Sequence, residues 1–488
     1  PAEETPLIAA LAVDILREAG VPRDALHLLP GDGRVGARLV GNPHLRGVLF
    51  TGSTEVARLI NRTLAERLNP DGAPVPLIAE TGGQNAMVVD SSALPEQVVA
   101  DAIVSAFDSA GQRCSALRLL LVQEEIADRV TAMLRGAMAE LAVGVPDRLA
   151  TDVGPVISAE ARDGILAHIA AMRAQGRRVH QAQLGEGCAH GTFVPPTLIE
   201  IERVAELKLE VFGPVLHVLR YRRDALDSVI HDVNATGYAL TFGVHSRVDA
   251  TVARAGELAA AGNVYVNRSV IGAVVGVQPF GGHGLSGTGP KAGGPLYLRR
   301  LLAAAPCEPA LPAVAPPDVT TAYLDWLRAR HPEVAQRVGR QVAAARVGVD
   351  LALPGPVGEE NRYATHPRGT VLCHATTLEE LLAQVAAALA TGNAARVPGS
   401  ADAFRVLPAP LAARVLPGDG AFDAVLFDGD PADLRALLRG LAASDGPIRP
   451  VMTRAPGTEL HATDMLVTER VVSTNTAAAG GNASLMSL

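Results

Sequence analysis

The feature that most constrains the fold is a strand, glycine turn and helix pattern that occurs twice in the chain. The first copy joins Leu29-Pro-Gly-Asp-Gly33 to Gly47-Val-Leu-Phe-Thr-Gly-Ser53, and the second joins Leu416-Pro-Gly-Asp-Gly420 to Ala424-Val-Leu-Phe-Asp-Gly-Asp430. Short apolar runs that end in a glycine turn and lead into a helix are typical of a parallel sheet covered by helices. The sequence therefore predicts an α/β fold with a doubly wound sheet, followed by a second, related α/β unit.

Around the first copy, the apolar spacing predicts alternating helices and strands. In chain order these are a helix over residues 5–20, a strand over 25–29, a turn over 30–36, a short helix over 37–40, a strand over 47–50 and a helix from Thr54 to about Leu68. Ligands of doubly wound sheets bind where strands end and helix N-termini present free N–H groups. Ser53 lies at such a point, so it either contacts a pyrophosphate or simply caps its helix.

Composition indicates a globular enzyme of several domains. The chain has 488 residues, 48% of them hydrophobic, and a net charge of −8. At about 150 residues per domain, two to four domains are expected. The negative charge and the scattered basic residues argue against nucleic-acid binding. No apolar run reaches the roughly 18 residues of a membrane span. The chain begins at Pro1, and we expect it to be part of a longer protein.

The cysteines limit the chemistry further. Cys114, Cys188, Cys307 and Cys373 are far apart in the sequence and match neither a zinc-site spacing nor a disulfide framework. We therefore predict no metal site, and a reducing, cytoplasmic location fits best.

Two short strings carry residues suited to covalent catalysis. Glu80 directly precedes Thr81-Gly82-Gly83, and Cys114 lies in Gly111-Gln-Arg-Cys-Ser115. A cysteine in a turn of small residues can present a reactive thiolate, and a carboxylate can serve it as general base. A single cysteine is more often a small buried residue, however, and a single glutamate is more often solvated. The residue types alone leave both interpretations open.

Both strings resemble motifs of the aldehyde dehydrogenase superfamily, where the first carries the general base and the second the nucleophile. The resemblance continues in order at Phe50-Thr-Gly-Ser53, Lys208-Leu-Glu-Val-Phe-Gly-Pro-Val215, Asn234-Ala-Thr-Gly-Tyr-Ala-Leu-Thr241 and Gly262-Asn-Val-Tyr-Val-Asn267. It implies the aldehyde dehydrogenase fold, in which a doubly wound dinucleotide domain is joined to an α/β catalytic domain. It also implies that Cys114 forms a thiohemiacetal and then a thioester, which water activated by Glu80 hydrolyses.

The same resemblance implies NAD as the cofactor, although the sequence lacks the usual GxGxxG fingerprint. The cofactor-binding residues that it implies are Gly33, Gly36, Phe50, Gly52, Ser53, Thr81, Glu210 and Phe212. Glu210 would hold the nicotinamide ribose and Phe212 would pack beside the ring; taken alone, they are equally an exposed acid and a core aromatic. The family's ribose-contacting lysine and oxyanion-hole asparagine would precede Pro1. The choice between NAD and NADP therefore stays open.

A glycine-rich run narrows the range of candidate substrates. Residues 278–295 resemble the aldehyde-anchor loop of L-glutamate γ-semialdehyde (1-pyrroline-5-carboxylate) dehydrogenases. Consecutive glycines can turn backbone N–H groups towards a carboxylate, so Gly293, Gly294 and the Ser115 hydroxyl are predicted to bind the substrate. The resemblance implies NAD-dependent oxidation of this aldehyde to glutamate, the second step of proline catabolism. Oxidation of another ω-semialdehyde acid and a non-catalytic scaffold remain as alternatives.

The resemblance extends to the long bifunctional proline utilisation A (PutA) proteins, in which an FAD-dependent proline dehydrogenase domain precedes the aldehyde dehydrogenase. It implies five divisions: the remainder of the NAD-binding domain at 1–82, the catalytic thiol domain at 83–282, an anchor loop and oligomerisation segment at 283–304, a Pro-rich linker at 305–320, and a non-catalytic aldehyde-dehydrogenase-like domain at 321–488. A homodimer that pairs through residues 283–300 and 470–488 is a further possibility.

The last division is expected to have lost dinucleotide binding. Asp430 stands where the first copy has Ser53, with Asp428 beside it, and two carboxylates would repel a phosphate. Cys373 lies in an apolar run and is expected to be a buried structural thiol. We expect this domain to cover the tunnel that passes the intermediate between two active sites, or else to be only a stabilising repeat.

Overall fold

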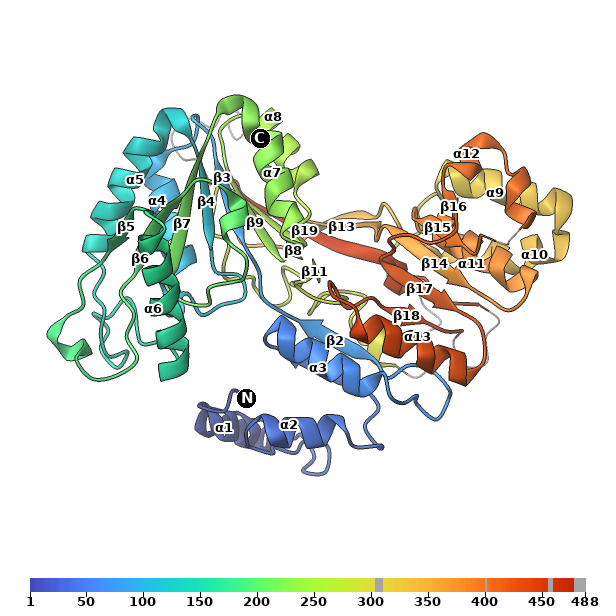
Figure 1. The fold of residues 1–488 in the computed structure, drawn as a ribbon, viewed down its shortest axis with the longest axis horizontal. Coiled ribbons are helices and arrows are strands. Elements are labelled where there is room, and N and C mark those ends of the chain that lie inside the picture. Colours follow the sequence, from blue (N-terminus) through green and yellow to red (C-terminus); the bar gives the residue numbers. More distant parts are fainter. Residues whose placement is uncertain (303–309, 400–401, 455–459, 478–488) are drawn as a thin grey trace.

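The fold is that of a computed structural model, which describes residues 1–302, 310–399, 402–454 and 460–477. Its largest sheet has ten strands, in the order β12-β13-β19-β10-β9-β3-β4-β7-β6-β5 (Figure 1). Seven of them come from the predicted catalytic part: β3 (Ala86–Val89), β4 (Leu119–Gln123), β5 (Val179–Gln181), β6 (Thr197–Ile201), β7 (Val215–Tyr221), β9 (Thr241–His245) and β10 (Asn263–Val266).

The central strands of this sheet are apolar and buried along their whole length. Every residue of β3 and β4 is buried, and each of these strands pairs in parallel with its neighbours. Continuous apolar strands are typical of parallel sheets with both faces covered. The flanking helices are α4 (Pro95–Phe107), α5 (Glu124–Ala139), α6 (Ala159–Ala174), α7 (Leu226–Ala235) and α8 (Asp249–Leu258). Strand ends and loops of this sheet build the site described below.

The N-terminal part forms a smaller layer. Its elements are α1 (Pro6–Glu18), α2 (Gly33–Val40), β1 (Val48–Thr51), α3 (Thr54–Leu64) and β2 (Leu77–Glu80). Strands β1 and β2 pair in parallel, and the order β1, glycine turn, α3 confirms the predicted pattern. Ser53 caps α3, because its side chain accepts a hydrogen bond from the Val56 N–H.

Three local predictions in this part were wrong. Residues 25–29 are not a strand, because none of the described strands pairs with them and the Ala25 N–H bonds back to the Pro22 carbonyl. Helix α2 begins at Gly33 rather than residue 37, since the Asp32 side chain already caps it by accepting from the Arg34 N–H. Helix α3 ends at Leu64 rather than Leu68.

The second copy of the pattern forms a five-stranded parallel sheet in the order β16-β15-β14-β17-β18. Its strands are β14 (Thr370–His374), β15 (Ala394–Val397), β16 (Val415–Pro417), β17 (Ala424–Phe427) and β18 (Val451–Met452), and its helices are α9 (Asp318–Arg330), α10 (Pro332–Ala344), α11 (Leu378–Ala390), α12 (Ala409–Ala412) and α13 (Pro431–Ala443). Cys373 is fully buried in β14, as predicted for a structural thiol. Cys307 lies outside the described residues.

The repeat is present in the structure as well as in the sequence. Strand β17 is followed by a glycine turn and α13, just as β1 is followed by α3. Asp430 caps α13 by accepting from the N–H groups of Ala432 and Asp433, and Asp428 forms an ion pair with Arg454. A carboxylate therefore already occupies the helix N-terminus, where the first copy has a neutral hydroxyl.

The predicted C-terminal domain also adds three strands to the large sheet: β12 (Asp350–Leu353), β13 (Glu359–Pro367) and β19 (Val467–Asn475). Strand β19 pairs in parallel with β10, with Val471 opposite Asn263. Helix α13 also contacts α3, and Arg439 forms an ion pair with Glu66 (Figure 1). The two halves of the chain are thus joined by a shared sheet and by their repeated helices, while the predicted domain boundaries stay a prediction. Residues 303–309, at the end of the predicted anchor segment and the start of the predicted linker, and residues 478–488 lie outside the described residues.

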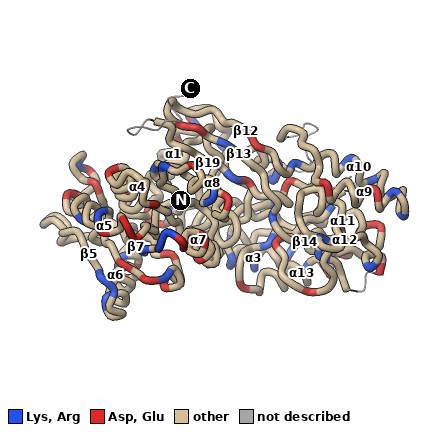
Figure 2. The backbone as a smooth tube through the Cα atoms, turned by 90° about the horizontal axis from the view of Figure 1, so that it is seen from above, with Lys and Arg blue, Asp and Glu red and all other residues tan. Residues whose placement is uncertain are grey.

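Acidic and basic residues are interspersed along the whole backbone (Figure 2). Within the described ranges, no helix is both long and apolar enough to cross a membrane.

Candidate active site

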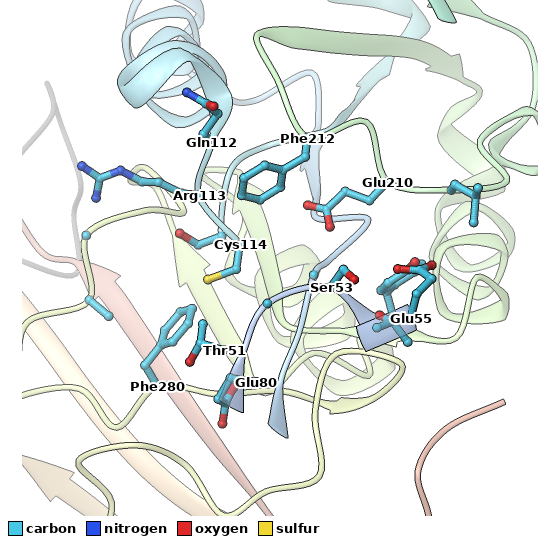
Figure 3. Close-up of a pocket in the computed structure, with 18 residues that line it drawn as sticks. Thr51, Ser53, Glu55, Glu80, Gln112, Arg113, Cys114, Glu210, Phe212 and Phe280 are labelled. Carbon is cyan, nitrogen blue, oxygen red and sulfur yellow. The ribbon is translucent and has the colours of Figure 1, made fainter. Parts of the chain in front are cut away.

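A cavity of about 940 Å³ lies where the N-terminal layer meets the large sheet. The residues labelled in Figure 3 lie near the start of α3, at the end of β2, in the turn before β4, in the loop before β7 and in the glycine-rich run, and Tyr238, Gly272 and Ala273 complete the lining. The lining residues are Thr51, Gly52, Ser53, Thr54, Glu55, Glu80, Gly82, Gln112, Arg113, Cys114, Ser115, Leu209, Glu210, Phe212, Tyr238, Gly272, Ala273 and Phe280.

This lining contains both predicted catalytic residues, Cys114 and Glu80, and the predicted substrate residue Ser115. Of the predicted cofactor residues, it contains Gly52, Ser53, Glu210 and Phe212. The remaining predicted residues, all of them described, lie outside the lining: Gly33, Gly36, Phe50, Thr81, Gly293 and Gly294.

The turn that carries Cys114 has an unusual backbone. Ser109 and Ala110 both have φ of 54°, and Gly111 follows with φ of 66°. Left-handed conformations of non-glycine residues are strained and concentrate at functional sites. A Cβ at Gly111 would lie 2.2 Å from the Gly213 carbonyl oxygen, so the close approach requires glycine. The turn therefore packs tightly against the loop before β7.

Asn85 holds the other side of this turn. Its Nδ2 donates to the Cys114 carbonyl at 2.7 Å and to the Ala116 carbonyl at 2.9 Å, and its Oδ1 accepts from the Thr241 N–H at 3.1 Å. Asn85 is 2% exposed, so water does not compete for these bonds. Its amide fixes the backbone of Cys114 relative to β9.

The Cys114 thiol itself is half-buried. Burial raises its pKa, and the nearby carboxylates of Glu80 and Glu210 raise it further. These surroundings disfavour the thiolate, which is the nucleophilic form of a cysteine.

Glu80 ends β2 and lies beside the glycine-rich run. A Cβ at Gly281 would lie 2.7 Å from Glu80 Oε1, so the carboxyl is pressed against glycine backbone. Burial raises the pKa of Glu80 to about 8, while the Lys291 ammonium and the Gly282 backbone act in the opposite direction. A carboxyl with a pKa in this range can take up and release a proton near neutral pH, as a general base must.

Glu210 forms a buried ion pair with Arg118, which also contacts the turn that carries Cys114. Arg118 Nη2 lies 3.0 Å from Glu210 Oε1, and Gly83 N–H donates to Glu210 Oε2 at 3.2 Å. The same guanidinium donates to the carbonyls of Gly111 at 2.7 Å and Arg113 at 3.1 Å. Arg118 therefore ties the Glu210 loop to the turn that carries Cys114.

Two neighbours complete this corner of the cavity. A Cβ at Gly82 would lie 1.8 Å from Glu210 Oε2, so a side chain at this position would displace the carboxylate. The Phe212 ring is 44% exposed, and its centroid lies 5.2 Å from the Arg118 guanidinium carbon. Figure 3 shows Phe212 and Glu210 on the same side of the cavity as Cys114. An exposed ring beside a carboxylate is suited to contact a planar group.

The predicted residues outside the lining have other surroundings. Thr81 is buried and donates from Oγ1 to the Leu285 carbonyl at 2.6 Å, which joins β2 to the glycine-rich run. Phe50 packs in the small core of the N-terminal layer, and Gly33 and Gly36 lie on α2. Gly293 has φ of +70° and is exposed, and a Cβ at Gly294 would lie 2.8 Å from Glu469 Oε1. Their binding roles remain predictions.

Sequence reasoning missed Asn85 and Arg118. Arg118 could have been found from the sequence, because it directly precedes a largely apolar strand. An arginine at such a position is expected to be buried, and a buried arginine is almost always paired with polar groups. Asn85 belongs to the string that begins at Glu80, yet its partners at Cys114 and Thr241 are 29 and 156 residues away. Such partners are visible only once the strands are in register.

A model of the aldehyde dehydrogenase family matches residues 1–304. Over its whole length, the chain is 52% identical to a bifunctional protein PutA from Rhizobium meliloti, but it covers only 41% of that protein. It thus spans about two fifths of the length of such relatives.

Solved structures agree with this match. A proline utilisation A (PutA) structure from Corynebacterium freiburgense aligns with 96% of this chain and 46% of its own, at a TM-score of 0.75 and 27% identity. A 1-pyrroline-5-carboxylate dehydrogenase from Thermus with bound NAD aligns with 62% of this chain and 58% of its own, at a TM-score of 0.57 and 37% identity. With a thiol and a carboxylate lining one cavity inside the matched residues, this chain belongs to the aldehyde dehydrogenase family.

Proposed function

We propose that this chain is the aldehyde dehydrogenase part of a bifunctional proline-catabolic enzyme and oxidises L-glutamate γ-semialdehyde to L-glutamate with NAD. The observation that carries the proposal is the single cavity lined by Cys114, Glu80 and Glu210. It is supported by the 52% identity to a bifunctional protein PutA and by the fold shared with a 1-pyrroline-5-carboxylate dehydrogenase that binds NAD.

The cavity suits a dinucleotide. Helix α3, of 11 residues, begins at the cavity and presents its first N–H groups there, which favours a pyrophosphate. The Glu210 carboxylate, held by Arg118, can accept hydrogen bonds from a ribose, and the exposed Phe212 ring can pack against a nicotinamide. Bound NAD supplies the hydride acceptor for the oxidation.

The remaining chemistry belongs to the protein. Cys114 gives its proton to solvent water, its sulfur bonds to the aldehyde carbon as the C=O π bond opens, and backbone N–H groups of the turn stabilise the resulting oxyanion. Loss of hydride from that carbon leaves a thioester on Cys114. Glu80 then removes a proton from water, the hydroxide attacks the thioester carbon, and the C–S bond breaks to give the carboxylate and the Cys114 thiol; Glu80 afterwards gives its proton to solvent.

The direct test is NADH formation by the full-length protein with glutamate semialdehyde, compared with succinate semialdehyde. We expect strong preference for glutamate semialdehyde and loss of activity in Cys114→Ala. Equal activity with both aldehydes would favour an enzyme for another ω-semialdehyde acid. Inactivity of the wild type, or activity that survives Cys114→Ala, would contradict the thiol mechanism.

Other parts of the proposal concern the rest of the protein. We infer an upstream proline dehydrogenase domain that carries FAD, a cytoplasmic location and a possible homodimer, all from the similarity to PutA proteins. We also infer that the C-terminal unit covers a path between two active sites, or serves only as a stabilising repeat. Its Asp430 cap supports the absence of a second dinucleotide site.

A further inference from the structure

A second group of buried charges lies near Glu80 and outside the lining of the large cavity. It consists of Lys291 and Glu469, which are 3% and 6% exposed. Lys291 Nζ donates to Asn263 Oδ1 at 2.6 Å and to the Gly281 carbonyl. Lys291 is one of only two lysines in the chain, the other being Lys208. Burial of an ammonium group destabilises the fold unless the group is paired with an opposite charge or hydrogen-bonded.

Glu469 brings a carboxylate to the Lys291 backbone from a distant part of the sequence. It lies on β19, and its Oε2 accepts from the Lys291 backbone N–H at 2.6 Å. Its Oε1 accepts from the Tyr363 hydroxyl at 2.8 Å, and Tyr363 lies on the neighbouring β13. Two strands of the C-terminal half thus hold the carboxylate in place.

Gly281 lies in space between Lys291 and Glu80, the proposed general base. Its carbonyl accepts from Lys291, while a Cβ on the same residue would lie 2.7 Å from Glu80 Oε1. Next to it, a cavity of about 20 Å³ is lined by Gly281, Lys291 and Glu469 among others, which is room for about one water molecule. Because bulk solvent does not fit, charges across Gly281 are little screened.

We propose that Lys291 and Glu469 are positioning residues that control the ionisation of Glu80, so that β19, which lies outside the family-matched residues 1–304, takes part in water activation. The inference rests on the proposed function only in the step that it affects, the hydrolysis of the thioester.

The two residues act on Glu80 in opposite directions. The Lys291 ammonium favours the ionised carboxylate and lowers the pKa of Glu80, whereas the Glu469 carboxylate disfavours it and raises that pKa. Burial lowers the pKa of Lys291 to about 8, while the carboxylates of Glu469 and Glu80 act in the opposite direction and favour the charged ammonium. The other charged or titratable groups that face Glu80, Lys291 or Glu469 are Cys114, His283, Tyr297, Tyr363, Arg368 and Arg470.

The test is the pH dependence of thioester hydrolysis in the full-length protein, measured after a single turnover. The hydrolysis rate should rise with pH as Glu80 ionises. In Lys291→Met, this rising limb of the pH–rate profile should shift to higher pH by about one unit, because the ionised Glu80 loses its cation. Below the pH at which Lys291 loses its proton, Glu469→Gln should shift the limb to lower pH, because the Lys291 ammonium then acts on Glu80 without the opposing carboxylate. Opposite shifts are a result that a merely structural role would not produce. Lys291→Arg, which keeps the charge, should restore the wild-type limb.

Two further measurements keep the test decisive. Tyr363→Phe removes the hydroxyl that donates to the ionised Glu469. It should therefore shift the rising limb in the same direction as Glu469→Gln, but by less. This milder variant keeps the test usable if the other variants fold poorly. Alkylation of Cys114 by iodoacetamide across pH senses the Glu80 charge without any substrate, so it separates failure of this inference from failure of the proposed function. Shifts of the same sign in Lys291→Met and Glu469→Gln, or no shift in Tyr363→Phe and the alkylation profile, would overturn the inference.

Discussion

At the scale of single residues, the site depends on buried charges whose partners come from several elements. Arg118 is 1% exposed and contacts the nucleophile turn and Glu210 at once. The carboxyl of Glu80, by contrast, lies against glycine backbone rather than an ion-pair partner. The first arrangement fixes geometry, and the second leaves a carboxyl free to exchange its proton.

Removal of Arg118 should destabilise both the fold and the site. In Arg118→Met, the buried Glu210 carboxylate loses its cation, which should cost about 3–5 kcal/mol of the free energy of unfolding. KM for NAD should rise and kcat should fall together, because the turn that carries Cys114 loosens as well. Urea unfolding and steady-state kinetics measure these effects.

The matched control is Arg129→Met, which breaks the exposed pair with Glu96, whose side chains are 63% and 55% exposed. Exposed pairs contribute about 0–1 kcal/mol, so this variant should behave like the wild type. Equal unfolding midpoints for the two variants would contradict the structural role of Arg118.

The pH dependence of hydrolysis follows from Glu80. Its pKa of about 8 lies well above the usual value because the carboxyl is buried, so the active carboxylate form accumulates as pH rises through 8. The single-turnover rate of thioester hydrolysis should therefore increase from pH 6 and level off above about pH 8–9. Glu80→Gln should remove this limb; a limb that persists in the variant would show that another group titrates.

The pairing of Cys114 and Glu80 in one site was predictable from the sequence, whereas the residues that support them were not. Cys114 and Glu80 lie in short strings with recognisable neighbours. Arg118 and Glu469 act through partners that are 92 and 178 residues away, Glu210 and Lys291. Local patterns carry no information on such pairs, because strand register and loop packing bring them together.

At the scale of elements, the two helices of the repeat show how one position can change its role. Ser53 and Asp430 both cap the helix that follows their strand. The predicted order of strand, turn and helix was correct in both copies, because glycine turns and N-caps are local signals. The strand predicted at residues 25–29 was wrong, because a strand also needs a neighbour with which to pair, and local sequence does not reveal one.

The cap of α13 can be tested by stability. Asp430→Ala should lower the free energy of unfolding by about 1 kcal/mol, since two N–H groups lose their acceptor, while Asp430→Ser should be close to neutral. Asp445→Ala, in an exposed turn after the same helix, is the control. Equal losses in Asp430→Ala and Asp445→Ala, measured by urea unfolding, would argue against capping.

At the scale of the whole molecule, the two halves share one sheet. Strand β19 pairs with β10 along Asn263–Val266, and β13 pairs with β19 over nine residue pairs. The sequence predicted the halves as separate domains joined by a linker, because pairing between strands that are far apart in the chain cannot be recognised from a local sequence pattern. The proposed catalytic half therefore borders strands from beyond the family-matched residues.

A chain cut after residue 304 should reveal this dependence. It would leave the N–H and C=O groups of β10 unpaired at a sheet edge, and exposed edges promote aggregation. We expect the shortened protein to aggregate or to lose cooperative unfolding, as followed by light scattering and circular dichroism. A monomeric, cooperatively folded and fully active product would contradict the shared-sheet account.

The central claim is that Cys114 carries the acyl group and Glu80 activates the water that removes it. The most direct measurement mixes full-length Glu80→Gln with NAD and glutamate semialdehyde, follows NADH in the first turnover and analyses the Cys114 peptide by mass spectrometry. We predict a burst of NADH, then almost no turnover, with the acyl adduct on Cys114. Steady turnover at the wild-type rate, or a burst with no adduct on Cys114, would contradict the claim.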